Sequence, residues 1–176
     1  MNRLNNRTYV PILFVLPTLG TGGSERVVLN LCLHLGPDYV PIVAAFRDGP
    51  LRKDMSDVGI QVHVLNRRGG IDFMLIVKLA RLIRIHQIKI LNCHHFVSLF
   101  YAFWAACLTG IPIIHTEHSK WEMETLTPFW NWWFSFFLKR IDLVSAVSKI
   151  TYAHIKEIYN VEEKRLALVL NGIDVN

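Results

Sequence analysis

The sequence has few charged residues, few cysteines and no long run of basic side chains. Only 19% of its 176 residues are charged, whereas 52% are hydrophobic. This composition excludes a disordered segment and allows the chain to bury a full core. The net charge of +5 is spread along the chain, so the basic stripe typical of nucleic-acid-binding proteins is missing. We therefore expect one globular domain without a nucleic-acid partner, although a phosphate ligand or an anionic membrane would suit its mild positive charge.

Cysteines are scarce, and their positions do not form pairs. Cys32, Cys93 and Cys107 lie in apolar contexts, and an odd number without paired spacing predicts buried thiols in a reducing compartment. The Cys and His spacings match no familiar zinc-binding pattern, so we predict no metal and no cofactor. Pro11 and Pro17 interrupt the first apolar run, which does not fit a signal peptide. These features favour a cytoplasmic protein.

One segment must be tested as a membrane span. Residues 96–114 carry no charge over 19 positions, which is near the minimum for a spanning helix. The segment contains Thr109-Gly110-Ile111-Pro112, a combination that stops a helix. We interpret it as a buried helix, a turn and a buried strand.

Strand-like and helix-like segments alternate along the chain. Continuous Val/Ile/Leu runs, typical of strands covered on both faces, predict strands at residues 9–16, 40–46, 61–65, 89–92, 112–116, 143–146 and 167–170. Apolar periodicity with start and stop signals predicts helices at about 25–35, 51–58, 73–86, 95–109, 128–140 and 149–159. The alternation predicts an α/β fold with a doubly wound, mostly parallel, Rossmann-like sheet.

A glycine-rich turn follows the first predicted strand, with Gly20, Gly22 and Gly23 before a helix. Glycine lets a backbone approach a ligand closely, and the N–H groups of a helix N-terminus attract anions. The pattern is not G-x-G-x-x-G, because Glu25 stands at the third glycine position, and no P-loop Gly-Lys-Ser/Thr follows. Ser24 is the expected N-cap of the helix. The turn is therefore either a phosphate-binding loop or an ordinary capped turn.

Other polar and titratable residues also follow predicted strands. In a parallel sheet the carboxyl ends of the strands meet at one edge, where open α/β sheets bind their ligands. Guanidinium groups suit bidentate anion binding, and histidines can donate hydrogen bonds to sugar hydroxyls. The residues predicted at this edge are Arg67, Arg68, His94, His95, His115, Glu117, His118, Ser148 and Lys149. Together they predict a site for a sugar or phosphate ligand.

The predicted helix at 128–140 is unusually aromatic. Residues 129–138 read Phe-Trp-Asn-Trp-Trp-Phe-Ser-Phe-Phe-Leu and are followed by Lys139 and Arg140, with Trp121 nearby. This is apolar nearly all round, which exceeds the need of one buried face. Such a helix either lies in a membrane interface or belongs to the core or to a surface covered by a partner.

Four segments together resemble the amino-terminal domain of family 4 glycosyltransferases, which are retaining enzymes of the GT-B fold. They are Gly22-Gly-Ser-Glu-Arg-Val-Val28, His115-Thr-Glu-His-Ser119, Ser145-Ala-Val-Ser148 and Asn171-Gly-Ile-Asp174, in the family's order over nearly the whole chain. The resemblance implies transfer of a sugar from a nucleotide-sugar donor to a glycan or lipid-linked acceptor, as in polysaccharide or lipopolysaccharide assembly. Such a protein would be cytoplasmic or peripheral on the inner face of the cytoplasmic membrane.

The resemblance also implies a domain organisation. Residues 1–170 would form the acceptor-side Rossmann-like domain, and residues 171–176 would begin the junction to a second domain that this chain lacks. We therefore expect half of an interdomain cleft and no transfer by the chain alone. The alternatives are a non-catalytic nucleotide- or sugar-binding module and a membrane-surface interaction domain.

Roles for the predicted site residues follow from their places in these segments. His118 resembles the family's histidine near the donor sugar and is the predicted catalytic residue. Gly22 and Gly23 resemble the loop that faces the donor phosphates, and Ser148 and Lys149 are also placed near the donor. The predicted acceptor-binding residues are His94, His95, Arg67, Arg68 and Glu117. Glu117 is favoured as a hydrogen-bonding residue over a general base.

Overall fold

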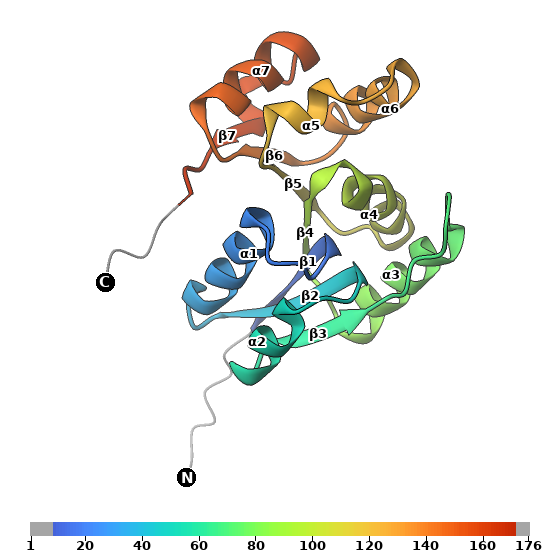
Figure 1. The fold of residues 1–176 in the computed structure, drawn as a ribbon, viewed down its shortest axis with the longest axis vertical. Coiled ribbons are helices and arrows are strands. Elements are labelled where there is room, and N and C mark those ends of the chain that lie inside the picture. Colours follow the sequence, from blue (N-terminus) through green and yellow to red (C-terminus); the bar gives the residue numbers. More distant parts are fainter. Residues whose placement is uncertain (1–8, 172–176) are drawn as a thin grey trace.

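The structure is a computed structural model that describes residues 9–171. Its centre is one sheet of seven strands in the order β3-β2-β1-β4-β5-β6-β7, and every neighbouring pair is parallel (Figure 1). The strands are β1 (Val10–Thr18), β2 (Tyr39–Arg47), β3 (Gln61–Val64), β4 (Ile90–His94), β5 (Ile113–Glu117), β6 (Leu143–Ala146) and β7 (Leu166–Leu168). The strand order reverses between β1 and β4, which is the point where such sheets bind ligands.

Helices cover both faces of this sheet, which confirms the doubly wound fold. They are α1 (Gly23–His34), α2 (Leu51–Asp57), α3 (Phe73–Ile85), α4 (His95–Thr109), α5 (Lys120–Glu124), α6 (Pro128–Leu138) and α7 (Lys149–Tyr159), with a short 3-10 turn at Glu163–Arg165. One buried cluster joins α3, α4, α6 and α7 to the sheet, and a second joins α1 and α2 to the other face. Figure 1 shows α1 and α2 on one side of the strands and α3 and α4 on the opposite side.

The structure confirms that the uncharged segment at residues 96–114 is a helix, a turn and a strand. Helix α4 ends at Thr109, Gly110 takes a left-handed conformation with φ of 71°, and β5 begins at Ile113. A Cβ would strain that conformation, so glycine suits the turn. Within residues 9–171, no helix combines the length and apolar character needed to cross a membrane.

Some local predictions were wrong. Ser24 is not the N-cap of α1, because the helix starts at Gly23 with Gly22 at the cap and without a side-chain cap. Cys32 and Cys93 are buried as expected, but Cys107 is exposed on α4. The short helix α5 and the 3-10 turn were not predicted. Of the motif at residues 171–174, the last three residues lie outside the described part, so the interdomain junction stays a prediction.

The aromatic helix α6 is largely a core helix. Phe134 and Phe137 are fully buried, and Phe137 packs against Phe103 of α4 with ring centroids 4.7 Å apart. Trp133 also stacks on Phe137 at 5.5 Å. Aromatic pairs contribute about 1 kcal/mol each beyond the area they bury. This packing fixes α4, and the N-terminus of α4 carries the histidines described next.

Candidate functional site

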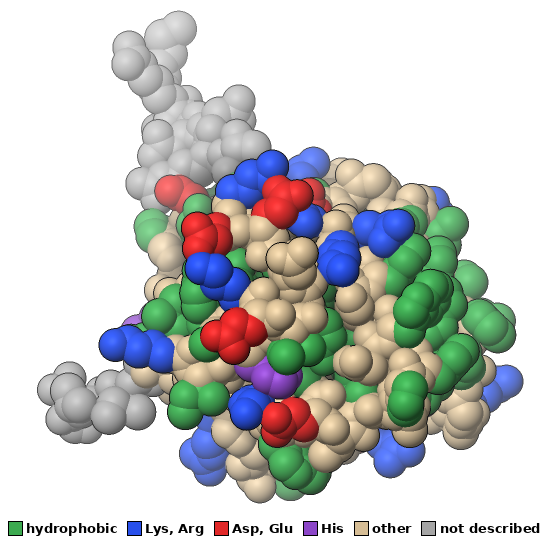
Figure 2. Space-filling model, turned by 90° about the horizontal axis from the view of Figure 1, so that it is seen from above, with side chains coloured by type: hydrophobic (Ala, Val, Ile, Leu, Met, Phe, Trp, Pro, Cys, Tyr) green, Lys and Arg blue, Asp and Glu red, His purple; other side chains and the backbone are tan. Residues whose placement is uncertain are grey.

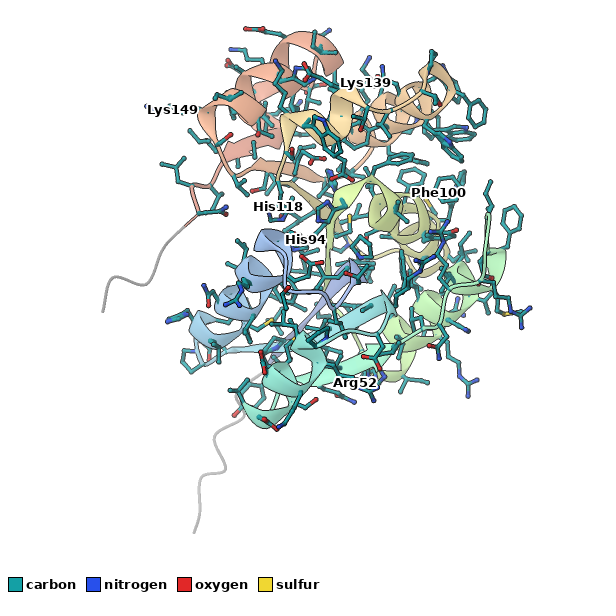
Figure 3. All side chains as sticks on the ribbon, viewed as in Figure 1. Arg52, His94, Phe100, His118, Lys139 and Lys149 are labelled. Atoms are coloured by element: carbon teal, nitrogen blue, oxygen red, sulfur yellow. The ribbon has the colours of Figure 1, made fainter. Side chains whose placement is uncertain are left out.

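Three loops meet at the carboxyl edge of the sheet. The glycine turn follows β1, His94 and His95 end β4 and open α4, and residues 117–119 lead from β5 into α5. Because β1, β4 and β5 are neighbours in the sheet, these segments lie side by side. Figure 3 shows His94 and His118 close together at this edge.

His94 and His118 form a hydrogen-bonded pair. Nδ1 of His94 lies 2.7 Å from Nε2 of His118, and the two rings stack with centroids 5.0 Å apart. One ring must donate and the other accept, so the pair cannot be doubly charged. Burial holds the pKa of His94 well below 6.5 and lowers the pKa of His118 to about 4, with neighbouring His95 and His115 acting in the same direction. Both rings are therefore neutral at pH 7.

His95 has the opposite electrostatic character. Its backbone is left-handed with φ of 68°, which is uncommon outside glycine. The imidazole lies between two oxygens: Nδ1 is 2.5 Å from Oε2 of Glu122, and Nε2 is 2.8 Å from Oγ of Ser24. Burial alone would lower the pKa of His95, but the hydrogen bond and charge of Glu122, with Glu117 and Glu25, raise it above 6.5.

The His95 contact extends into the glycine turn. Ser24 Oγ donates to Oε2 of Glu25 at 2.7 Å, and Thr18 Oγ1 donates to Oε1 of the same carboxylate at 2.9 Å. Thr18 Oγ1 in turn accepts the N–H of Gly20 at 3.1 Å. A cationic His95 can donate through both nitrogens, so the donors and acceptors alternate consistently from Glu122 to Glu25. The glycine turn is thereby joined to the start of α4 and to α5.

Glu122 is a site residue that the sequence analysis missed. Its Oε1 also accepts the N–H of Phe96 at 3.2 Å, so the carboxylate caps the first turn of α4 while holding His95. Burial would raise the pKa of Glu122, but the hydrogen bond to His95 lowers it. The available signal was Ser119-x-x-Glu122, the spacing of a capping box that opens a helix. In the structure Ser119 is the N-cap residue of α5, without a side-chain cap, and Glu122 serves α4 instead.

Glu117 shapes the loop that carries His118. Its Oε1 accepts the N–H groups of His118 and Ser119 at 3.0 and 3.1 Å, and its Oε2 lies 3.2 Å from Nε2 of His115. The side chains of Glu117 and His115 are both fully buried. Glu117 is thus bonded within the protein, as its predicted hydrogen-bonding character suggests, and it positions His118. Among the described residues, no group of three His, Cys, Asp or Glu side chains is arranged to hold a metal ion.

The glycines near the site differ in how much space they leave for a side chain. At Gly22 an added Cβ would lie 2.6 Å from Oε2 of Glu25, whereas at Gly23 it would meet nothing within 4 Å. The tightest approach is at Gly49, after β2, where a Cβ would lie 2.2 Å from the carbonyl oxygen of Leu19. Gly22 and Gly23 are exposed, so the N-terminus of α1 is open to a ligand.

The remaining predicted residues do not join the histidines. Arg67 follows β3, which is separated from β4 by two strands, and it donates to the carbonyl of Gly70 at 2.8 Å. Arg68 is exposed in the same loop. Ser148 is the N-cap of α7, where its Oγ accepts the N–H of Thr151 at 3.1 Å. Lys149 is exposed and lies away from His118 in Figure 3.

A cavity of about 620 Å³ opens on the α1 side of the sheet. Its lining is mainly apolar, with side chains such as Val27, Leu31, Ile114 and Val169, and it includes none of the predicted site residues. A mainly apolar wall without Lys or Arg offers little compensation for the charge of a diphosphate. The carboxyl edge with its histidines and open helix N-terminus is therefore the better candidate site.

Comparisons with known proteins identify the family. The family profile described as Glycosyltransferase Family 4 matches residues 21–176. No curated protein matches the chain. The fold is similar to HepE of Anabaena solved with UDP, at 18% identity and a TM-score of 0.81, covering 95% of this chain and 45% of HepE.

Two further solved structures show the same relationship. A glycosyltransferase from Rickettsia africae has 19% identity and a TM-score of 0.78, over 94% of this chain and 44% of that protein. The lipopolysaccharide outer core galactosyltransferase WaaB has 15% identity and a TM-score of 0.70, over 95% of this chain and 47% of WaaB. This chain spans less than half the length of these proteins, and at such identities the likeness shows the fold alone. The match over residues 21–176 together with this Rossmann-like half of a GT-B architecture shows that the chain belongs to glycosyltransferase family 4.

Proposed function

We propose that this chain forms the acceptor-side wall of a retaining glycosyltransferase that moves a sugar from a nucleotide-sugar donor to a glycan or lipid-linked acceptor in the cytoplasm. The observation that carries the proposal is the hydrogen-bonded series from Glu122 through His95 and Ser24 to Glu25, which joins the glycine turn to the histidine loop. HepE, which has the same fold, is solved with UDP and with UDP-glucose, and this supports a nucleotide-sugar ligand.

The glycine turn would bind the donor diphosphate. Gly22 and Gly23 are exposed at the N-terminus of α1, where free N–H groups and the helix dipole attract anions. Negative charge develops on the diphosphate as the sugar leaves, and donors that are already fixed stabilise that charge best. The bonds of Ser24 to His95 and Glu25 hold the turn in one geometry before the donor arrives.

His118 would bind the sugar as a neutral imidazole. Its Nε2 is engaged by His94, so Nδ1 is the nitrogen left for a sugar hydroxyl. With a pKa of about 4, His118 is a neutral imidazole at neutral pH, so it has no imidazolium proton to donate as a general acid. Its proposed role is to orient the sugar by one hydrogen bond.

Transfer would need more protein than this chain. The chain spans about 45% of the length of HepE, and we propose that it binds ligands without turning them over by itself. Sugar transfer from a panel of nucleotide sugars should therefore be measured with the chain alone and with the continuation of its reading frame.

The decisive variant is His118→Ala in the longer protein. We expect turnover to fall at least ~10-fold, which corresponds to about 1.4 kcal/mol of barrier. His34→Ala, at an exposed position on α1, is the matched control and should keep wild-type turnover. Unchanged kinetics for His118→Ala would remove that residue from the site. No turnover by the longer protein with any donor, combined with UDP binding, would favour a non-catalytic binding module.

A further inference from the structure

We propose that His94 is a positioning residue, which keeps the proton of His118 on Nδ1 so that His118 presents an N–H to the donor sugar. The identity of that ligand rests on the proposed function. The side chains of His94 and His115 are fully buried, and on the face that Figure 2 shows, histidine reaches the surface only in small spots. His94 meets His118 inside the protein, with Nδ1 of His94 2.7 Å from Nε2 of His118 (Figure 3). It therefore acts on a ligand through His118 and not by contact.

The second ring nitrogen of His94 decides which ring donates. Within residues 9–171, Nε2 of His94 is buried and has no hydrogen-bond partner. Each ring of the neutral pair carries one proton, and the nitrogen that holds it is assigned from the hydrogen bonds of the ring. A proton on Nε2 would leave a buried N–H unpaired, which is rarer in proteins than an unpaired acceptor. The proton of His94 is therefore assigned to Nδ1, the nitrogen that faces His118.

This assignment fixes the state of His118 as well. Because Nδ1 of His94 donates, Nε2 of His118 accepts and carries no proton, so the single proton of His118 lies on Nδ1. Nδ1 of His118 has no partner among the described residues and is not one of the buried unpaired atoms, so solvent and a ligand can reach it. A histidine free in water favours the proton on Nε2. The pair thus imposes the less common tautomer on His118.

The backbone at the end of β4 sends neighbouring histidines to different partners. His94 is extended, with φ of −119° and ψ of 135°, whereas His95 is left-handed with φ of 68°. Such a conformation is unfavourable for a residue other than glycine and gathers at functional sites. It lets His94 bond His118 while His95 bonds Glu122. Glu117 accepts the backbone N–H of His118, so the ring and the backbone of His118 are both held before a ligand arrives.

An N–H of fixed direction on His118 selects an oxygen acceptor in the ligand. Under the proposed function, that acceptor is a hydroxyl oxygen of the donor sugar. One such bond from an oriented donor group contributes about fivefold to affinity. Without His94, Nε2 of His118 would regain a proton and the ring would be free to turn. The bond to the sugar would then weaken, whereas the contacts of the nucleotide would stay as they are.

The proton positions can be measured by long-range 15N–1H correlation spectra of the labelled chain at neutral pH, because protonated and unprotonated imidazole nitrogens have clearly different 15N shifts. We expect His94 and His118 each to carry the proton on Nδ1. In His94→Ala the proton of His118 should move to Nε2. His94→Asn keeps an amide N–H near the place of Nδ1 and should keep the proton of His118 on Nδ1. A wild-type His118 with its proton on Nε2 would overturn the proposal, as would an unchanged His118 in His94→Ala.

The matched control is His63→Ala. Nε2 of His63 is likewise buried and without a partner among the described residues, yet β3 is separated from β4 by two strands. The nitrogen shifts of His118 should not change in this variant, and circular dichroism should show that each variant is folded. The wild-type spectrum decides the tautomer by itself, even if His94→Ala does not fold.

The consequence for the ligand can be measured by calorimetry with UDP and UDP-glucose. His94→Ala should weaken UDP-glucose binding about fivefold and leave UDP binding unchanged, and His94→Asn should recover most of the loss. An equal loss for both ligands would mean that His94 only supports the fold of the site, which would overturn its positioning role. If the wild-type chain binds neither ligand, the proposed function fails, whereas the spectra still decide where the proton of His118 lies.

Discussion

The loss of stability on acidification should depend on His118. The change is His118→Gln, because a glutamine amide can replace Nε2 in the bond to His94 Nδ1 but does not titrate. In the wild-type protein, burial lowers the pKa of His118 from 6.5 to about 4. The unfolded chain therefore binds a proton at this residue below pH 6.5, whereas the folded chain binds it only below about pH 4. Stability contributed by neutral His118 is present above pH 6.5 and is lost as pH falls toward 4.

The size of the effect follows from the two pKa values. The pKa of His118 is 6.5 in the unfolded chain and about 4 in the folded chain. At about 1.4 kcal/mol for each pKa unit, this difference corresponds to about 3 kcal/mol of folding stability, all of which is lost well below pH 4. Between pH 7 and pH 5, linkage gives about 2 kcal/mol for this residue. His94 remains buried in both proteins, and because burial is the main cause of its lowered pKa, the difference between the two proteins reports mainly on His118.

The measurement is the free energy of unfolding in urea at several pH values. Wild type should lose about 2 kcal/mol more than His118→Gln between pH 7 and pH 5. His34→Gln removes an exposed histidine on α1 and should keep the steep wild-type loss. If the free energy of unfolding fell equally with pH in wild type and in His118→Gln, the folded pKa of His118 would be near 6.5. That result would refute the argument that burial lowers this pKa.

Three other changes have definite expected outcomes. Gly49→Ala should destabilise the fold by about 1–3 kcal/mol, because the added Cβ would lie 2.2 Å from the carbonyl oxygen of Leu19; urea unfolding would measure it, and a neutral result would contradict the close approach. Glu122→Gln should move the NMR titration of His95 to lower pH, since it removes the charge that raises the pKa. In the wild-type protein, the raised pKa of His95 contributes stability that is fully present below pH 6.5 and is lost as pH rises through the folded pKa. The free energy of unfolding of Glu122→Gln should therefore fall furthest below that of wild type in acid. Phe137→Ala should cost about 3–5 kcal/mol because the ring is fully buried, and a smaller loss in urea unfolding would mean that the core around α6 collapses to fill the space.

The sequence predicted the elements of the fold well because they carry strong local signals. A strand covered on both faces must be apolar throughout, and Ile12 to Leu16 of β1 are all buried. The start of α3 at Phe73 follows a local signal too, since Asp72 caps that helix through the N–H of Met74. Helix α5 has only five residues, which is too short for an apolar period to be visible.

The site was less predictable because its contacts join residues far apart in the chain. Ser24 has the type and place of an N-cap, but His95, 71 residues away, binds its hydroxyl in the structure. Arg67 is predicted to bind the acceptor from its strand-end position, and the sequence did not reveal that its Nε donates to the hydroxyl of Tyr101 at 3.3 Å. Side-chain hydrogen bonds of this kind depend on tertiary packing, which local propensity does not encode.

The three central histidines are close together, yet their partners divide them into two kinds. His94 and His118 face each other, and neither gains from a charge because each would repel the other and lose hydration. His95 is also buried, but the carboxylate of Glu122 favours its cation. The ring of His95 thus belongs to the rigid support of the glycine turn, where a diphosphate would bind under the proposed function. Under the proposed function, the neutral ring of His118 would bond a sugar hydroxyl without desolvating a charge, and the two kinds of histidine would give separate environments to the two halves of a nucleotide-sugar.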